Sequence, residues 1–231
     1  SVTRTGSEVY EQAKAEATTV EQVIRGFVEA ATPAERFQWV SDGERIKEAF
    51  HRFYETRPVV PIKVKAFLAI MPTELNGRKL YLSKFEDEAG DPDYVILTLE
   101  DKGYRVEWES TMAYGELDWE SFCAELPQRN VEMRVYLEWS NHYDGKYDTP
   151  VKYQSFYLTH PSSDKGIYAY VPRDSLVWER IKTSTIPGGK SPVNLLLTFE
   201  SDAEPRDSAL VVDFLHKHWI RPVEDPGEGT E

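Results

Sequence analysis

Apolar residues recur with helical spacing in the first part of the chain. They occupy one face of a helix, at Val20, Val23, Ile24, Phe27, Val28 and Ala31. A capping box at Thr18-x-x-Glu21 or Thr19-x-x-Gln22 would begin this helix. Residues 1–17 are polar and rich in alanine, and we expect them to form a linker or a frayed helix.

Two shorter helices are predicted next. Thr32-Pro33-Ala34-Glu35 combines a cap, a proline at the first helical position and a glutamate three residues after the cap. Ser41-Asp42-Gly43-Glu44 opens the third helix, where Ile46, Ala49, Phe50, Phe53 and Tyr54 repeat the helical spacing. Pro58 and Pro61 end it, because proline cannot continue a helix.

From Ile62 the apolar period changes to that of a strand. Ile62, Val64, Ala66, Leu68 and Ile70 alternate with other residues, and Asn76-Gly77 is the sequence signature of a tight hairpin turn. Asp91-Pro92 and Gly103 mark two further turns. The pattern predicts a meander of four antiparallel strands with the helices covering one face, which is an α+β unit.

The stretch from Gly103 to Glu125 is expected to close this first unit. By strand alternation, Tyr104, Val106 and Trp108 share one face, while Arg105, Glu107 and Glu109 point to solvent. Asp118 can cap a short helix from Trp119 to Ala124. Leu126-Pro127-Gln128 is the best boundary, so the first domain is predicted to span residues 18–126.

The second half alternates again, beginning with Val131 to Trp139. Strands are predicted at 131–139, 153–159, 167–171, 193–199 and 210–220, and Asp174 or Ser175 caps a helix that Pro187-Gly188-Gly189 breaks. The order β-β-β-α-β-β is that of a five-stranded OB-like barrel. We therefore expect an OB-like β domain over residues 129–222, followed by a disordered acidic tail over 223–231.

Charge limits the partners of such a protein. The chain has 27 Lys and Arg against 40 Asp and Glu, a formal net charge of −13. This charge repels nucleic acid and anionic membrane surfaces, and no run of basic residues provides a local exception. We expect no nucleic-acid partner.

Cysteine usage and the chain start bear on location. Cys123 is the single cysteine, so an intramolecular disulfide is excluded, and we interpret it as a buried apolar residue. No run of eighteen apolar residues is present that would span a membrane. The chain begins SVTRTG without Met, and we expect a signal or membrane anchor to precede Ser1 in the full-length protein.

Two short segments resemble known phosphate-binding and metal-binding motifs. Gly188-Gly189-Lys190-Ser191 ends like a phosphate-binding loop, but Ser184 stands where the motif needs glycine and Pro192 follows where a helix should begin, so we interpret it as a plain loop. His216-x-His218 would place two imidazoles on one strand face. Two ligands are too few for a metal, and the further candidates cannot be placed from sequence (Asp213, His160 and His142).

Carboxylates and tyrosines each leave two interpretations open. The carboxylates of Glu107, Glu109, Glu116, Asp118 and Glu120 form either a solvated surface or the surroundings of a catalytic base. Six tyrosines of the second half either pack on a sheet with hydrated hydroxyls or stack on the bases or sugars of a ligand. They are Tyr143, Tyr147, Tyr153, Tyr157, Tyr168 and Tyr170.

A family resemblance covers residues 18–126. The helical run 20–54, the proline-rich entry to the meander and the segment 106–122 resemble an NTF2-like (cystatin-like) α+β cone. More narrowly, they resemble uncharacterised bacterial membrane-anchored proteins whose extracytoplasmic part follows an N-terminal membrane helix. The resemblance implies an extracytoplasmic location. It also implies that an enzyme of this kind would hold an acidic or histidine base inside the cone.

We therefore predict an α+β protein of two domains, with N-terminal helices packed on a curved antiparallel sheet, then a small five-stranded barrel with one helix. We expect a non-catalytic binding or scaffolding portion of a larger bacterial protein, with a protein or a small ligand as its partner. The alternative is an NTF2-like small-molecule enzyme that uses acid–base chemistry in the cone pocket. No catalytic, cofactor-binding or metal-ligating residue is assigned.

Overall fold

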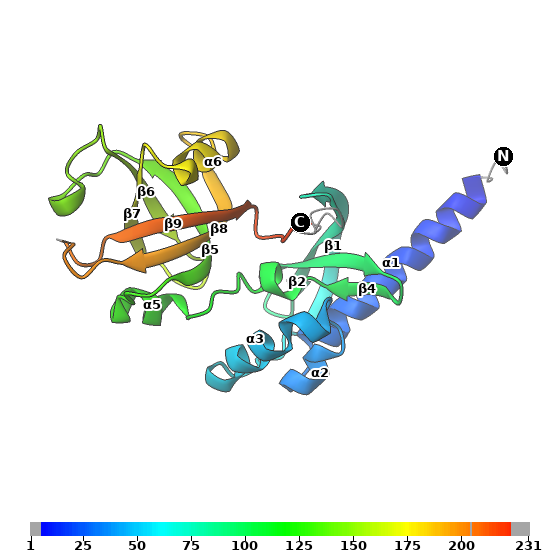
Figure 1. The fold of residues 1–231 in the computed structure, drawn as a ribbon. Helices are drawn as coiled ribbons and strands as arrows, with labels where there is room; N and C mark the ends of the chain where they lie inside the picture. Colours follow the sequence, from blue (N-terminus) through cyan, green and yellow to red (C-terminus); the bar gives the residue numbers. More distant parts are fainter. Residues whose placement is uncertain (1–5, 204, 223–231) are drawn as a thin grey trace, which may run out of the picture. The chain divides into compact units, whose positions relative to one another are not determined.

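The computed structural model describes residues 6–203 and 205–222. Helices and strands are both abundant, and the strands form two sheets, one of four and one of five strands, so the predicted α+β class is confirmed. The chain divides into two compact units, Ser1–Thr111 and Met112–Glu231, each described by itself (Figure 1). The predicted tail at 223–231 lies outside the described residues.

The first unit begins with one long helix, α1 (Gly6–Val28). Its predicted apolar face is confirmed, since Val20, Val23, Ile24, Phe27 and Val28 are all buried. The predicted helix start at Thr18 or Thr19 is wrong, because Thr19 lies inside α1 and its hydroxyl donates to the carbonyl of Ala15. Residues 6–17, predicted as part of a linker or frayed helix, therefore form the first turns of α1. This part of the helix extends past the sheet (Figure 1).

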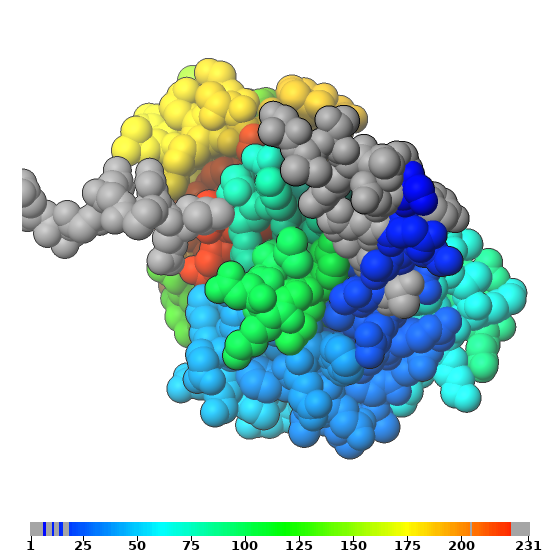
Figure 2. All heavy atoms as spheres, turned by 90° about the vertical axis from the view of Figure 1, so that its right-hand side faces the viewer, coloured from blue at the N-terminus to red at the C-terminus, as the bar shows by residue number. Residues whose placement is uncertain are grey.

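Helices α2 (Pro33–Phe37) and α3 (Gly43–Thr56) follow the predicted boundaries. The Thr32 hydroxyl accepts from the backbone N–H of Glu35, and the Glu35 carboxylate accepts from the N–H of Thr32, which completes the capping box. Figure 2 shows the three helices side by side on one face of the unit. They bury Ile46, Phe50 and Phe53 of α3.

The sheet of the first unit is the predicted meander. Strands β1 (Val64–Leu75), β2 (Arg78–Asp87), β3 (Pro92–Glu100) and β4 (Gly103–Val106) pair in sequence order, all antiparallel. Asn76 and Gly77 form the hairpin turn with φ values of 52° and 74°, as a type I′ turn requires.

Aromatic rings fill much of the space between the helices and the sheet. Phe50 packs against Trp108 with ring centroids 5.1 Å apart, and Phe53 meets the same indole edge-on at 5.4 Å. Phe122 falls within the predicted first domain at 18–126, but it packs in the core of the second unit. The reason is that its helix, predicted as the end of the first domain, belongs to the second unit.

The alternation predicted for Tyr104 to Glu109 is only half right. Tyr104, Val106 and Trp108 are buried as expected. Strand β4 ends at Val106, however, and the short helix α4 (Trp108–Thr111) begins two residues later. The prediction that Glu107 and Glu109 face solvent is wrong, since both are buried, because a helical turn replaces the strand period at this point.

The second unit begins earlier than the predicted boundary at 126–129. Helix α5 (Trp119–Glu125) is capped by Asp118 as expected, but its residues Trp119, Phe122 and Cys123 belong to the same hydrophobic core as the barrel strands. A helix whose buried face packs on the second sheet belongs to the second unit. The predicted first domain 18–126 is therefore too long, and the second domain 129–222 too short at its N-terminus.

The five strands of the second unit close on themselves. β5 (Val131–Ser140), β6 (Tyr153–Thr159) and β7 (Gly166–Pro172) pair in order, and β8 (Lys190–Phe199) pairs with β5 and with β9 (Ala209–Lys217). A short parallel pairing of β7 with β9 completes the closed order β5-β6-β7-β9-β8. Helix α6 (Leu176–Ser184), capped by Ser175, lies between β7 and β8 in sequence, and a 3₁₀ turn, η1 (Gly145–Tyr147), interrupts the β5–β6 loop.

Candidate functional site

Strand alternation places four tyrosines on the outer face of β6 and β7. Phe156 and Leu158 of β6 point into the barrel core, so Tyr153 and Tyr157 point outward. Tyr168 and Tyr170 of β7 point outward in the same way, and Tyr157 is directly opposite Tyr168 in the register. With Tyr143, Tyr147 and His142 of the β5–β6 loop, these residues form what we call the tyrosine face.

One part of the tyrosine face is closed. Tyr147 lies on Tyr170 with parallel rings 4.4 Å apart, both rings are fully buried, and Tyr153 packs edge-on against Tyr147 at 5.1 Å. The Tyr147 hydroxyl donates to Glu200 Oε2 at 2.5 Å. Burial and this hydrogen bond raise the pKa of Tyr147 far above its ordinary value, so the phenol stays neutral. Tyr147 and Tyr170 therefore pack on the sheet, as one of the two interpretations predicts, with the Tyr147 hydroxyl on Glu200.

A lysine fixes the loop that carries Tyr147. Lys146 Nζ lies 2.8 Å from Asp202 Oδ1 and 3.0 Å from Glu200 Oε2. The β5–β6 loop is thereby tied to the residues that follow β8, more than fifty positions away in sequence. These contacts hold the loop against the barrel wall, although Lys146 and Asp202 form an exposed pair of the kind that stabilises weakly by itself.

The other part of the tyrosine face is open. His142 is exposed and stacks on the half-buried ring of Tyr168, with centroids 3.9 Å apart and planes inclined by 21°. Tyr157 is also half-buried, and its ring centroid lies 5.2 Å from that of Tyr168. We call His142, Tyr157 and Tyr168 the open rings. They form a preformed aromatic surface in contact with solvent.

Glycine under Tyr157 allows this arrangement. A Cβ atom built on Gly166 would lie 2.3 Å from the Cζ atom and the hydroxyl of Tyr157. The ring therefore lies directly over the backbone at the start of β7, which only a residue without a side chain permits. The tyrosines can be recognised from the sequence, but the roles of Gly166, Lys146 and Glu200 cannot, because their partners become neighbours only in the folded chain.

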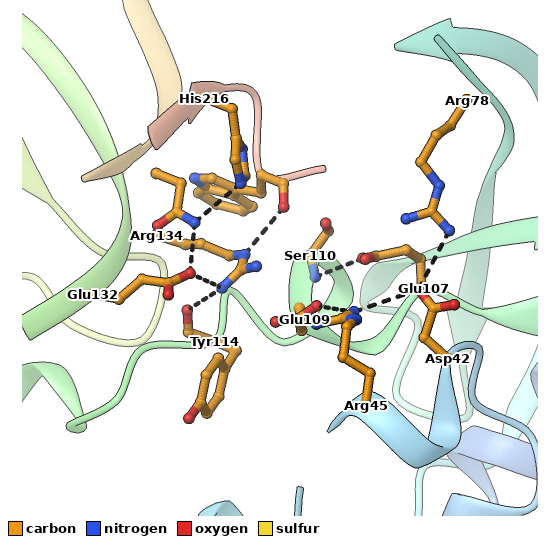
Figure 3. Close-up of polar contacts among 12 residues, drawn as sticks. Asp42, Arg45, Arg78, Glu107, Glu109, Ser110, Tyr114, Glu132, Arg134 and His216 are labelled. Carbon is orange, nitrogen blue, oxygen red and sulfur yellow. Dashed lines mark hydrogen bonds and ion pairs between the residues drawn. The ribbon is translucent and has the colours of Figure 1, made fainter. Parts of the chain in front are cut away.

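The two buried acids of the first unit lie in a separate polar cluster (Figure 3). Glu109 Oε2 pairs with Arg45 Nη2 at 2.5 Å, and Asp42 lies 3.4 Å from the same Arg45 nitrogen and 3.7 Å from Arg78. Burial by itself lowers the pKa of Arg45, but the hydrogen bond and charge of Glu109 outweigh it and raise the pKa. Glu107 Oε2 accepts from the backbone N–H of Ser110 at 2.8 Å. These contacts orient the carboxylate of Glu107, between β4 and α4, and that of Glu109 in α4.

A second polar cluster lies within the second unit (Figure 3). The Arg134 side chain is fully buried and donates to the carbonyls of Tyr114 (3.1 Å) and Trp219 (3.0 Å). Asn194 donates to Glu132 at 2.7 Å and lies 3.2 Å from His216 Nε2. Burial, followed by the charge of Arg134, lowers the pKa of His216 to about 4, so the imidazole is neutral near pH 7. This cluster fastens the segments before and after the barrel to β5.

The metal and phosphate motifs lack the local backbone geometry that such sites need. Strand β9 ends at Lys217 and His218 has a φ of 59°, so the two histidines do not continue along one strand. Within the described ranges, no three His, Cys, Asp or Glu side chains gather as metal ligands. A turn with Gly188 at φ 78° leads into strand β8 at Lys190, so a strand follows where the phosphate motif needs a helix. Cys123 is buried, as predicted, and burial raises the pKa of its thiol to about 11.

Comparison with known proteins adds no relative to this description. Neither a scan against protein-family models nor a search of curated proteins gives a match. Among the described residues, no helix is long and apolar enough to cross a membrane. What the chain itself defines is an α+β protein of two units with an aromatic surface on the second.

Proposed function

We propose that this chain is a non-catalytic binding or scaffolding portion of a larger bacterial protein, and that its ligand-binding surface is the tyrosine face. The observation that carries this proposal is the set of open rings, of which Tyr168 already stacks on His142 at 3.9 Å. Aromatic rings that a core needs are buried, as Tyr147 and Tyr170 are. Rings left in contact with water on a rigid wall are suited to stacking on a ligand.

The two fold resemblances are part of this proposal. For an NTF2-like first unit, the support is three helices followed by a four-stranded antiparallel meander. For an OB-like second unit, the support is the closed order β5-β6-β7-β9-β8, the parallel pairing of β7 with β9, and α6 between β7 and β8. In an OB-like barrel the second and third strands, here β6 and β7, carry the binding surface.

Ligand-induced shifts of tyrosine ring signals test the binding role. The intact chain, labelled in its tyrosine rings, is titrated with oligosaccharides, peptides and single-stranded DNA, and the ring signals are followed by NMR. We expect one ligand class to shift Tyr157 and Tyr168 while Tyr94, an exposed tyrosine of the first unit, stays unchanged. If no class shifts the two rings, the tyrosine face is a packed surface and the proposal is wrong.

An acid–base enzyme remains the second candidate function, because Glu107 and Glu109 of the first unit are buried. A base of this kind needs a perturbed pKa beside a pocket for substrate. Glu109 is instead paired with Arg45 at 2.5 Å, which favours a structural role. Carboxyl NMR titration distinguishes the two functions, since a carboxyl that titrates near pH 7 would favour the enzyme.

The extracytoplasmic location is also proposed, from the resemblance alone. Fusion of alkaline phosphatase to the C-terminus of the full-length protein tests it, because this reporter is active only outside the cytoplasm. An inactive fusion that is nevertheless present in full amount would place the chain inside the cell.

A further inference from the structure

We infer that the Asp144-Gly145 peptide of the β5–β6 loop is a site of spontaneous modification, at which the aspartate isomerises to isoaspartate. The Gly145 backbone N–H donates to Asp144 Oδ1 at 2.7 Å. Because Oδ1 is bonded to Cγ, the Gly145 nitrogen lies within about 4 Å of that carbon. The two atoms that must join are therefore already near the separation of about 3–3.5 Å from which bonds form. This inference does not depend on the proposed binding role.

The reaction needs no reagent other than water. The Gly145 nitrogen forms a bond to Cγ of the protonated Asp144 carboxyl, and the carboxyl hydroxyl leaves with the amide proton as water, which gives a five-membered cyclic imide. A water molecule then opens this ring. Attack at Cγ restores aspartate, whereas attack at the main-chain carbonyl carbon breaks its bond to the Gly145 nitrogen. The backbone then runs through Cβ and Cγ, and nothing has been oxidised or reduced.

Glycine at position 145 leaves the attacking nitrogen accessible. Both residues of the peptide are exposed, and Gly145 adds no side chain beside its nitrogen. Asp93 and Asp213 make the same contact with the next backbone N–H, at 2.7 and 2.8 Å. The residues that follow them are Tyr94 and Phe214, and both pairs lie in strands, β3 and β9, whose ladders hold the backbone. The contact alone is therefore not sufficient for reaction.

The chain has one other Asp-Gly peptide, Asp42-Gly43, and its surroundings differ. Gly43 begins helix α3, which fixes the backbone at this point. The Asp42 carboxylate lies 3.4 Å from Arg45 and 3.7 Å from Arg78, and these two side chains hold it in place. Within the described residues, the Asp144 carboxylate has no such ion pair. Only the peptide in the β5–β6 loop combines the glycine, the contact and a carboxylate that no cation holds.

Isomerisation would alter the tyrosine face. Isoaspartate lengthens the backbone by one methylene group shortly before Lys146 and Tyr147. Lys146 pairs with Asp202, and the Tyr147 hydroxyl donates to Glu200. Both contacts depend on where the loop places these side chains. We therefore expect the modified chain to lose part of the packing of Tyr147 on Tyr170.

Peptide mapping of the aged protein tests this inference. The intact folded chain is incubated for several weeks and digested, and isoaspartate is identified in each peptide by electron-transfer fragmentation, because it has the same mass as aspartate. We expect it to accumulate at Asp144 at least about ten times faster than at Asp42, Asp93 or Asp213. In urea the contacts of the fold are lost, so the two Asp-Gly peptides should react at similar rates.

Asp144→Glu is the matched variant. It keeps the charge, but the extra methylene group would require a six-membered ring, which forms more slowly. An isoaspartyl methyltransferase should therefore label the peptide around position 144 from the aged wild type and not from this variant. Asn76-Gly77 is counted separately, because its cyclisation releases ammonia and changes the mass.

Three outcomes would overturn the inference. The first is equal rates at Asp144 and Asp42 in the folded chain. The second is a difference between them that persists in urea, since the fold would then not be its cause. The third is equal labelling of the peptide around position 144 in the wild type and in Asp144→Glu.

Discussion

Gly166 is the residue on which the position of the Tyr157 ring depends. In Gly166→Ala the new Cβ atom would overlap the ring, so the ring must leave the position from which it contacts Tyr168. Because the ring is half-buried and can move, we expect a stability loss of no more than about 1 kcal/mol together with loss of the Tyr157–Tyr168 ring contact. NMR cross-peaks between the two rings measure the contact and urea unfolding measures the stability.

Gly189→Ala is the matched control for this change. Its nearest neighbour would be Ile186 at 3.4 Å, close to ordinary contact, so the ring cross-peaks should persist. In the double variant Gly166→Ala with Tyr157→Ala the clash disappears, and the two stability losses should not add. Ring cross-peaks that survive Gly166→Ala would show that the glycine is not what positions Tyr157.

His216 makes the stability of the second unit depend on pH. Its pKa falls from the ordinary 6.5 to about 4 in the folded chain, through burial and then the charge of Arg134. The unfolded chain therefore binds a proton that the folded chain does not as pH falls from 6.5 to about 4. The stability that the neutral His216 contributes is fully present above pH 6.5 and is lost as the pH falls from 6.5 to about 4. Since the ring is partly exposed, we expect a loss of the order of 1 to 2 kcal/mol.

Urea unfolding of the wild type and of His216→Gln at a series of pH values checks this expectation. Glutamine does not titrate, so the difference in unfolding free energy between the two proteins should shrink as pH falls through the window. Other groups that face His216 are Glu132 and Arg134 on β5, and Arg221, and they remain in both proteins. A difference that stays constant with pH would contradict the neutral, buried imidazole.

Arg45 is a charged partner of the buried Glu109. The Glu109 side chain is only 6% exposed, and Arg45→Met would leave its carboxylate without that cation. Loss of one partner of a buried pair costs more free energy than the pair contributes. We expect Arg45→Met to lower the unfolding free energy by about 2–3 kcal/mol, less than for a fully buried pair because Arg45 is partly exposed. Lys65→Met, which breaks the exposed pair with Glu86, should change the stability little. Equal effects in thermal unfolding would contradict a structural role for the Arg45–Glu109 pair.

At the scale of elements, residue patterns specify most helices and strands of this chain. Local rules were sufficient for the capping box at Thr32 and the turn at Asn76-Gly77, because both depend on neighbours in sequence. They failed at Glu107, where a helical turn starts directly after β4 and reverses which side chains are buried. Alternation shows how a strand divides its faces but does not show where the strand ends.

The candidate site divides in the same way. Outward positions of Tyr153, Tyr157, Tyr168 and Tyr170 follow from strand alternation and could be predicted. The sequence could not predict which of these rings are fully buried and which stay in contact with solvent. The Tyr147 hydroxyl bonds to Glu200, which lies 53 residues further along the chain. A contact between residues so far apart in sequence is determined by the folded barrel and not by local sequence.

At the scale of the whole molecule, the placement of α5 determines where the chain can be divided. Trp119, Phe122 and Cys123 share the hydrophobic core of the barrel with strands β5 to β9. We expect a fragment of residues 112–222 to fold, and a fragment of residues 129–222, which follows the boundary suggested by sequence, to lose cooperative unfolding. Trp119 and Phe122 are almost fully buried, and removal of large aromatic side chains from a core costs about 3–5 kcal/mol each. Losses of that size equal the total stability of many domains.

Near-UV circular dichroism and thermal unfolding of the two fragments measure the difference. A 129–222 fragment as stable as 112–222 would show that α5 is dispensable and that the boundary belongs after it.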